Sequence, residues 1–168
     1  MSSHNPHKEA QEENAVGKIS PRGLRITWGN DSRYWRINSS GTEAELLQVC
    51  WLEVTGKVRV DPRKKYNVKF EVSMRPDAFG WNGSPLLLMA KMGASGKYVW
   101  SRVNLQEQQK GVNERFQIPK DGLVVPPLPD NAASGITDLI FGMYEVSTEK
   151  WKGGLRIHHA FVQEEAKK

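Results

Sequence analysis

The residues best suited to binding a ligand lie in the stretch from Leu24 to Ile37, LRITWGNDSRYWRI. It holds three aromatic side chains, Trp28, Tyr34 and Trp35, on either side of a Gly-Asn-Asp-Ser turn signal. If both flanking runs are strands, Tyr34 and Trp35 point to opposite sides, so not all three rings can be buried. An exposed ring beside hydrogen-bonding groups suits a polar ligand with apolar faces. The competing interpretation is that Trp28 is a core residue and the other rings are partly covered.

The histidines and the cysteine give little support to catalysis. His4 and His7 lie near the N-terminus, and a strand would send the adjacent His158 and His159 to opposite faces, so we expect no shared metal site. Cys50 is the only cysteine and lies in an apolar run without a local base, which favours an inert buried thiol over a nucleophile. The sequence has no G-x-S-x-G, P-loop, H-E-x-x-H or paired-cysteine zinc spacing. We expect neither a metal nor a cofactor.

Two carboxylates leave one enzymatic alternative open. Asp138 and Glu145 could together hydrolyse a glycosidic bond if they flanked a sugar. Nothing in the sequence shows that these two residues converge.

The elements that must position these residues read as short strands separated by turn signals. Apolar and polar residues alternate most clearly from Tyr66 to Met74, and alternation in the last strand places Leu155, Ile157 and Phe161 on one inward face. Trp51 lies in an apolar run and is the tryptophan we expect in the core. The expected strands are 48–60, 66–74, 86–92, 97–103, 116–118, 136–146 and 155–162, with two short runs around 24–28 and 34–37. This pattern predicts an all-β antiparallel sandwich, either jelly-roll or immunoglobulin-like.

The positive charge is concentrated in one predicted hairpin. From Lys57 to Arg75 there are seven cations and two carboxylates, in a chain with a formal net charge of +5. Arg63, Lys64 and Lys65 form its turn. Such a hairpin could attract RNA phosphates or an acidic protein surface, although a solvated charged face is the commoner explanation.

Composition indicates one soluble domain with polar ends. The chain has 168 residues, 38% of them hydrophobic, and no apolar run near the roughly 18 residues that a membrane span needs. The polar start lacks the apolar core of a signal peptide, so we expect a cytosolic protein without membrane insertion. We expect a disordered arm over 1–19, a single domain over 20–163 and a charged tail over 164–168.

Three blocks of the sequence resemble a known family. ITWGNDSRYW, AELLQVCWLEVTGKV and MYEVSTEKWKGGLRI are similar, in the same order, to segments of the plant phloem lectins of the phloem-protein-two group and their relative Nictaba. The similarity covers roughly Ser20 to Val162, and the chain resembles the cucurbit phloem lectins of this group. The resemblance implies a jelly-roll-like β-sandwich, a homodimer, no enzymatic activity, and binding of chitooligosaccharides and the N-acetylglucosamine core of N-glycans. It also implies a cytoplasmic or phloem-sap location and, for some relatives, association with RNA.

The resemblance also suggests which residues bind sugar. The binding tryptophans of the family fall on Trp28 and Trp35, and its binding glutamate falls on Glu145. A second acidic position lands near Asp138, which is a shorter acid. Tyr34 adds a further ring on physical grounds, with Trp81 and Trp100 as weaker candidates in a region where family members vary.

These observations lead to one principal interpretation and two alternatives. The principal one is a non-enzymatic lectin for N-acetylglucosamine oligomers, in which aromatic plates stack on sugar rings and Glu145 accepts a hydrogen bond. The first alternative is a basic RNA-binding or protein-scaffolding module of phloem sap that uses Arg63, Lys64 and Lys65. The second is a chitin-cleaving hydrolase.

Overall fold

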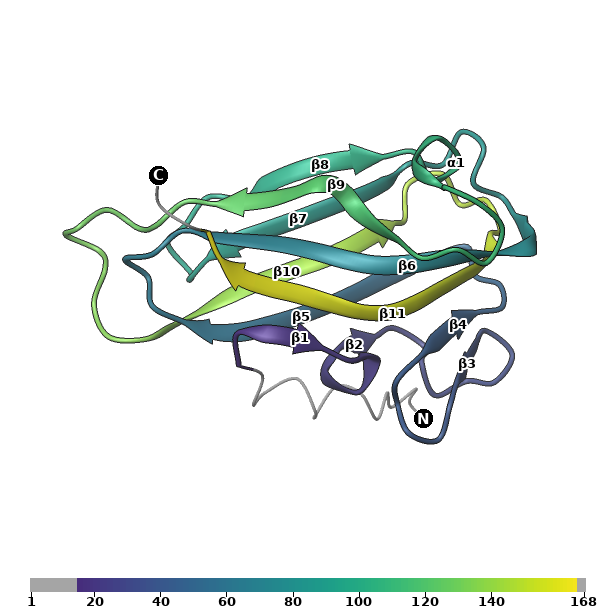
Figure 1. Cartoon of the computed structure of the whole chain (residues 1–168), viewed down its shortest axis with the longest axis horizontal. Coiled ribbons are helices and arrows are strands. Elements are labelled where there is room, and N and C mark those ends of the chain that lie inside the picture. Colours follow the sequence, from purple (N-terminus) through teal and green to yellow (C-terminus); the bar gives the residue numbers. More distant parts are fainter. Residues whose placement is uncertain (1–14, 166–168) are drawn as a thin grey trace.

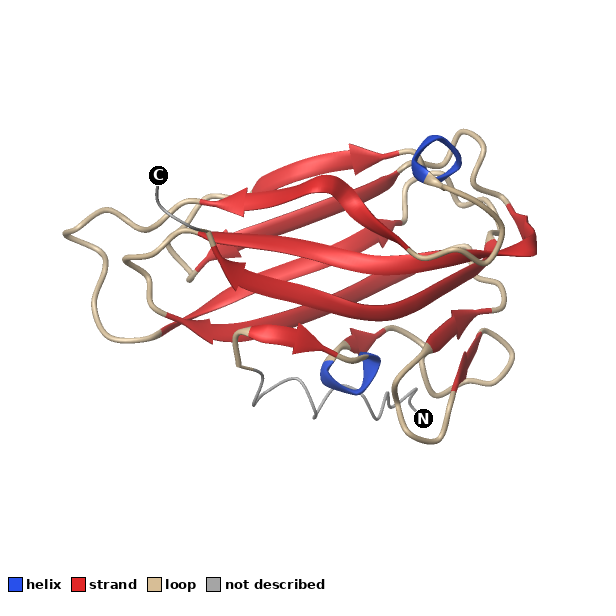
Figure 2. Cartoon of the chain, in the orientation of Figure 1, coloured by secondary structure: helices blue, strands red, loops and turns tan. Residues whose placement is uncertain are grey.

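Two antiparallel β-sheets packed face to face make up most of the computed structural model, which describes residues 15–165 (Figure 1). Strands dominate and the helices are single short turns (Figure 2). The predicted jelly-roll-like β-sandwich is therefore confirmed.

The six-stranded sheet has the order β3-β4-β11-β6-β9, and β1 also pairs with β11. Its strands are β1 (Gly17–Ile19), β3 (Trp35–Ile37), β4 (Ala44–Leu46), β6 (Tyr66–Phe79), β9 (Phe116–Val125) and β11 (Gly153–Glu164). The long central pair, β6 and β11, runs antiparallel along the whole length of this sheet.

The five-stranded sheet has the order β2-β5-β10-β7-β8. Its strands are β2 (Arg25–Ile26), β5 (Leu52–Val60), β7 (Leu86–Met92), β8 (Val99–Val103) and β10 (Thr137–Glu145). The 3-10 helix η3 (Pro21–Gly23) precedes β2, and α1 (Leu105–Gln108) follows β8, with the Asn104 side chain accepting hydrogen bonds at its N-terminus. Within residues 15–165, no helix has the length and apolar character needed to cross a bilayer.

Strict alternation of side chains builds the core between the sheets. Buried positions recur at every second residue of β5 and β7 and of β6 from Tyr66 to Val72. Phe70 from one sheet meets Phe141 from the other edge to face, with ring centroids 5.7 Å apart. Gly56 leaves room for this contact, since a Cβ there would lie 2.6 Å from the Phe141 ring.

A β-bulge in β11 changes the predicted orientation of several side chains. The register with β6 shifts between Ile157 and His159, so His158 is the extra residue. Both histidines consequently lie on the outer face, and Phe161 joins them with its ring 4.4 Å from the His159 ring. The predictions that the histidines face opposite sides and that Phe161 points inward are wrong, because both assume unbroken alternation.

The strand boundaries also revise the expected ends of the domain. Gly17–Ile19 pairs with β11 and Ile19 is buried, so the predicted boundary after residue 19 is placed too late. At the other end, Glu164 still belongs to β11 and the Glu165 amide donates to the Lys65 carbonyl. The rest of the predicted arm and tail lies outside the described residues.

Candidate ligand-binding site

The turn between β2 and β3 holds its first tryptophan in a strained backbone conformation. Trp28 has φ of +64°, in the left-handed region that bulky side chains rarely adopt. Hydrogen bonds fix the turn, from the Gly29 amide to the Ile26 carbonyl at 2.9 Å and from the Asp31 amide to the Trp28 carbonyl at 3.0 Å. Such strain costs about 1–3 kcal/mol and is concentrated at binding sites, so it marks this turn as a candidate site.

Trp28 and Tyr34 form a half-buried aromatic pair. Their ring centroids are 5.2 Å apart with planes tilted by 34°, and both rings pack on the core from one side. The Arg33 guanidinium lies 5.1 Å from the Tyr34 centroid and pairs with Asp31 at 2.7 Å. Hydrogen bonds from Arg33 hold the pKa of the Asp31 carboxyl below its usual range. The pair is thus an apolar surface bordered by fixed charges.

Trp35 is buried beneath this turn rather than exposed on it. Trp35 pairs with Leu46 in the β3–β4 ladder and is 2% exposed, and its indole Nε1 has no hydrogen-bond partner. The prediction that Trp35 is an exposed plate is therefore wrong. It contributes instead to the wall of a hollow of about 550 Å³, within the size range of small-ligand sites. The hollow is lined by Gly29, Asn30, Ser32, Trp35, Arg36, Ile37 and Leu47.

Residues 47–51, the connector between β4 and β5, tie this turn to the far end of the chain. The Leu47 amide donates to the Tyr34 carbonyl at 2.8 Å. Two residues later, Val49 exchanges backbone hydrogen bonds with Lys152 at 2.9 and 3.0 Å. The connector therefore brings the segment that follows Glu145 to the same end of the sandwich as the aromatic turn.

Glu145 is buried there in an ion pair. Its Oε1 lies 2.7 Å from Lys152 Nζ and accepts a hydrogen bond from the Thr148 hydroxyl at 2.7 Å. Burial alone would raise the pKa of Glu145, but Lys152 and Thr148 outweigh burial and lower it. The Glu145 side chain is 2% exposed, so its partners in this structure are internal. Lys152 is the important residue that the sequence analysis missed, because nothing local marks a lysine as buried.

Two further tryptophans differ from their predicted positions: Trp51, expected in the core, is exposed, and Trp81, a weaker binding candidate, is buried. Trp51 is 44% exposed, because Leu52 takes the inward position and alternation turns Trp51 outward. Its Nε1 donates to Glu53 at 2.9 Å. The prediction that Trp51 is a core residue is wrong. Trp81 is 3% exposed and donates from Nε1 to the Gly153 carbonyl at 3.0 Å, which gives it a supporting role.

Asp138 and Trp100 lie away from this site. Asp138 and Glu145 are seven residues apart on β10, about 23 Å by the rise of a strand, and lie on opposite faces. Paired glycosidase carboxyls are about 5–9.5 Å apart, so these two residues cannot flank one glycosidic bond. Trp100 lies on β8 at the opposite edge of the five-stranded sheet from β2 and is 57% exposed.

The predicted basic hairpin is not one positive surface. Arg63 pairs with Asp61 at 2.9 Å and Lys64 pairs with Glu164 at 3.3 Å. The two strands that flank this turn belong to different sheets, so their outward cations lie on opposite outer faces of the sandwich. This arrangement removes the main support for the RNA-binding alternative at Arg63, Lys64 and Lys65.

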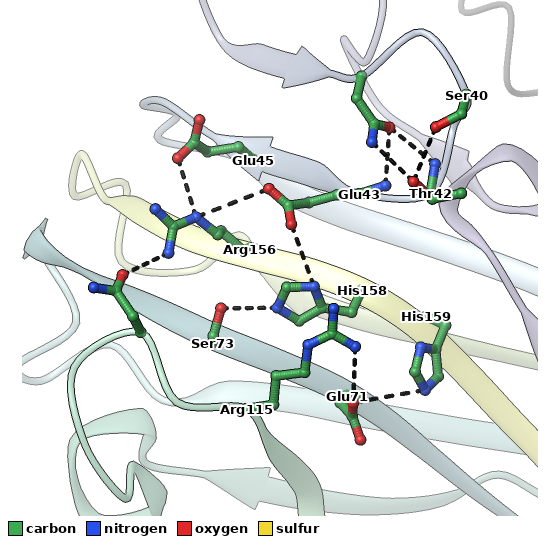
Figure 3. Close-up of polar contacts among 12 residues, drawn as sticks. Ser40, Thr42, Glu43, Glu45, Glu71, Ser73, Arg115, Arg156, His158 and His159 are labelled. Atoms are coloured by element: carbon green, nitrogen blue, oxygen red, sulfur yellow. Dashed lines mark hydrogen bonds and ion pairs between the residues drawn. The ribbon is translucent and has the colours of Figure 1, made fainter.

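A polar cluster on the outer face of the six-stranded sheet has the order of a serine–histidine–carboxylate triad (Figure 3). Ser73 Oγ lies 2.8 Å from His158 Nε2, and His158 Nδ1 lies 3.5 Å from a Glu43 oxygen. Burial, reinforced by the charge of Arg115, lowers the pKa of His158 to about 4, so the ring is neutral at pH 7. Ser73 is only 1% exposed, and a substrate cannot reach its hydroxyl. The cluster therefore fastens strands together and offers no accessible nucleophile.

Comparisons with known proteins agree with the resemblance in sequence. The model of the family described as phloem protein 2 matches residues 16–163. Protein PHLOEM PROTEIN 2-LIKE A9 of Arabidopsis thaliana is 45% identical over 166 residues, which cover 94% of this chain and 92% of that protein. A lectin of Luffa acutangula is 38% identical over 100 residues, covering 54% of this chain and 47% of the lectin. A lectin of Coccinia grandis is 33% identical over 109 residues, which cover 60% of this chain and 68% of that lectin.

Among solved structures, one similar fold is the C-terminal CBM6 of LamC, a marine laminarinase from Zobellia galactanivorans. The match covers 87% of this chain and 97% of that module, with a TM-score of 0.47 and 11% sequence identity. At this distance the likeness supports no statement about ligands. The family match is far stronger, since it spans nearly the whole described chain in register. The chain belongs to the phloem protein 2 family.

Proposed function

We propose that this protein is a lectin and that the Trp28–Tyr34 pair is its sugar-stacking surface. The observation that carries the proposal is the pair itself, two partly buried rings held in a strained turn beside Asp31 and Arg33. Pyranose rings present C–H groups on one face, which suit an aromatic plate, while their hydroxyls need directed polar partners. Relatives from Luffa acutangula and Coccinia grandis that are named lectins support this function.

The ligand we propose is an oligomer of N-acetylglucosamine, free or in the core of an N-glycan. The hollow beside the aromatic turn, lined in part by Gly29 and Asn30, offers room beyond one sugar unit. Each added sugar should bury more surface on a wall that is already ordered, so affinity should rise from the monomer to the trimer. We propose binding without catalysis, in the phloem and cytoplasm, by a homodimer.

Trp35 and Glu145 then support the site from beneath. Trp35 forms part of the hollow, and the Glu145–Lys152 pair anchors the connector whose Leu47 amide holds Tyr34. Direct contact between Glu145 and a sugar would require its buried carboxylate to exchange internal partners for the ligand. We therefore assign both residues to positioning.

Titration calorimetry with the N-acetylglucosamine trimer tests this proposal. Replacing Tyr34 with alanine removes one plate and should lower the affinity by about tenfold or more, because central aromatic residues dominate most binding surfaces. Trp100→Ala is the matched control, since it removes a more exposed ring at a distant edge and should leave the affinity unchanged. Unchanged binding by Tyr34→Ala would refute the site, and shortening of the trimer during the titration would refute a purely binding role.

A further inference from the structure

The outer face of the five-stranded sheet carries exposed rings that the proposed lectin site does not use. Tyr98 and Trp100 lie at its β8 edge and are 48% and 57% exposed. In the ladder, Trp100 pairs with Met89 of β7 and Met89 pairs with Gly142 of β10. These residues form one row across three neighbouring strands.

Tyr144 supplies a second plate within this row. A Cβ on Gly142 would lie 2.6 Å from the Tyr144 hydroxyl oxygen and 2.7 Å from Cζ, so the phenol ring covers the glycine backbone. The ring is therefore two strand spacings from Trp100, about 10 Å. Burial, with the nearby charge of Glu53, raises the pKa of Tyr144 to about 12, so its hydroxyl is a hydrogen-bond donor throughout the neutral and mildly alkaline range.

Positive charge predominates on this face. The outward positions of the five strands hold five cations and two carboxylates: Arg25, Lys57, Arg59, Lys91, Arg102, Glu53 and Asp138. Two of the cations lie against the rings, with Lys91 Nζ 4.8 Å from the Tyr98 centroid and the Arg102 guanidinium carbon 5.4 Å from the Trp100 centroid. Tyr98 and Trp100 thus each have a cation as an immediate neighbour, whereas the ladder partner of Tyr144 is the carboxylate Glu53.

We propose that this face, from Tyr98 and Trp100 to Tyr144, binds an extended acidic polysaccharide built from uronic acids. In a uronic acid the carboxylate is attached to the ring that stacks, so a plate and a cation must lie close together. Lys91 and Arg102 meet this requirement, since each lies over one face of its ring while the rings of Tyr98 and Trp100 stay about half exposed. In a nucleotide the base is the group that stacks, and a ribose separates it from the phosphate. A nucleic-acid site would therefore need cations set farther from the aromatic rings. The face is separate from the Trp28–Tyr34 site, and the two sites are tested with different ligands.

Affinity electrophoresis in gels containing sodium polygalacturonate tests the proposal, with fully methyl-esterified pectin as the uncharged match. The full chain should be retarded by polygalacturonate and much less by the ester. The double variant Tyr98→Ala, Trp100→Ala should weaken retardation by about tenfold or more, whereas Tyr34→Ala should leave it unchanged. Circular dichroism confirms that each variant is folded.

Two double variants distinguish binding at this face from a general attraction of the basic chain to a polyanion. Lys91→Gln with Arg102→Gln and Lys64→Gln with Lys65→Gln each remove two positive charges, and only the first pair should abolish the preference for polygalacturonate over its ester. Equal weakening by both pairs would overturn the proposal, as would equal retardation by the ester. The face would be assigned to nucleic acid instead if a single-stranded RNA displaced polygalacturonate and if Trp100→Ala weakened RNA binding more than it weakened polygalacturonate binding.

Discussion

The charge of Glu145 is balanced inside the protein, and this fact governs how its variants behave. The Lys152 side chain is fully buried and Glu145 nearly so. Replacing Lys152 with methionine would leave a buried carboxylate without its partner, which typically costs about 3–5 kcal/mol of folding free energy. Urea unfolding measures this loss. Lys64→Met is the control, because its pair with Glu164 is exposed and such pairs contribute about 0–1 kcal/mol. Equal effects of the two variants would show that the Glu145–Lys152 pair is not buried.

His158 should make stability depend on pH in a defined direction. The folded-state pKa is lowered to about 4 from an ordinary value of 6.5, so below pH 6.5 the unfolded chain binds the proton that the folded chain excludes. The stabilisation is complete above pH 6.5 and is lost as the pH falls towards 4, by at most about 3 kcal/mol. Burial also lowers the pKa of His159, which adds a loss of the same sign.

His158→Gln isolates this contribution, because glutamine can still hydrogen-bond to Ser73 but does not titrate. Urea unfolding from neutral pH down to about pH 4.5 should show a shallower loss of stability in the variant than in the parent. Carboxyls whose pKa is lowered in the folded state, such as Asp31, lose their contribution to stability at lower pH. This loss affects the parent and the variant alike. Parallel pH profiles would contradict a buried neutral His158.

At the residue scale, the sequence predicted where the candidate side chains gather better than how they are oriented. Trp28, Tyr34, Trp35 and Glu145 do gather at one end of the sandwich. Neighbouring residues do not tell a buried tryptophan from an exposed one, because Trp51 in an apolar run is exposed while Trp35 beside Arg36 is buried, and only the strand register decides which faces inward.

At the scale of elements, alternation predicted the strands well, and β7 begins and ends where expected. The exceptions have local causes. One extra residue in β11 reverses the faces of the side chains that follow, and no pattern in the sequence announces it. β1 is only three residues long, too short for any periodicity to show.

Truncation at the N-terminus measures the contribution of β1. Two deletions are compared: removal of residues 1–14 keeps β1, whereas removal of 1–19 also deletes the β1 ladder and the buried Ile19. We expect the second deletion to cost about 2 kcal/mol or more, a fall of roughly 4–8 °C by calorimetry. Equal melting temperatures would show that β1 contributes no stability.

At the scale of the whole molecule, the sandwich brings together segments more than a hundred residues apart. Tyr34 contacts the connector, the connector pairs with Lys152, and Lys152 holds Glu145. The individual segments could be recognised in the sequence, but their convergence depends on the order of strands in two sheets. The same arrangement separates the aromatic turn from Trp100, so that the two proposed sites lie on different surfaces.

The most direct test of the lectin proposal is a crystal of the full chain soaked with the N-acetylglucosamine trimer. We expect electron density for a sugar ring stacked on Trp28 and Tyr34, with the chain continuing into the hollow beside them and the Glu145–Lys152 pair intact. Density elsewhere, with the aromatic turn empty while the trimer binds in solution, would contradict the account.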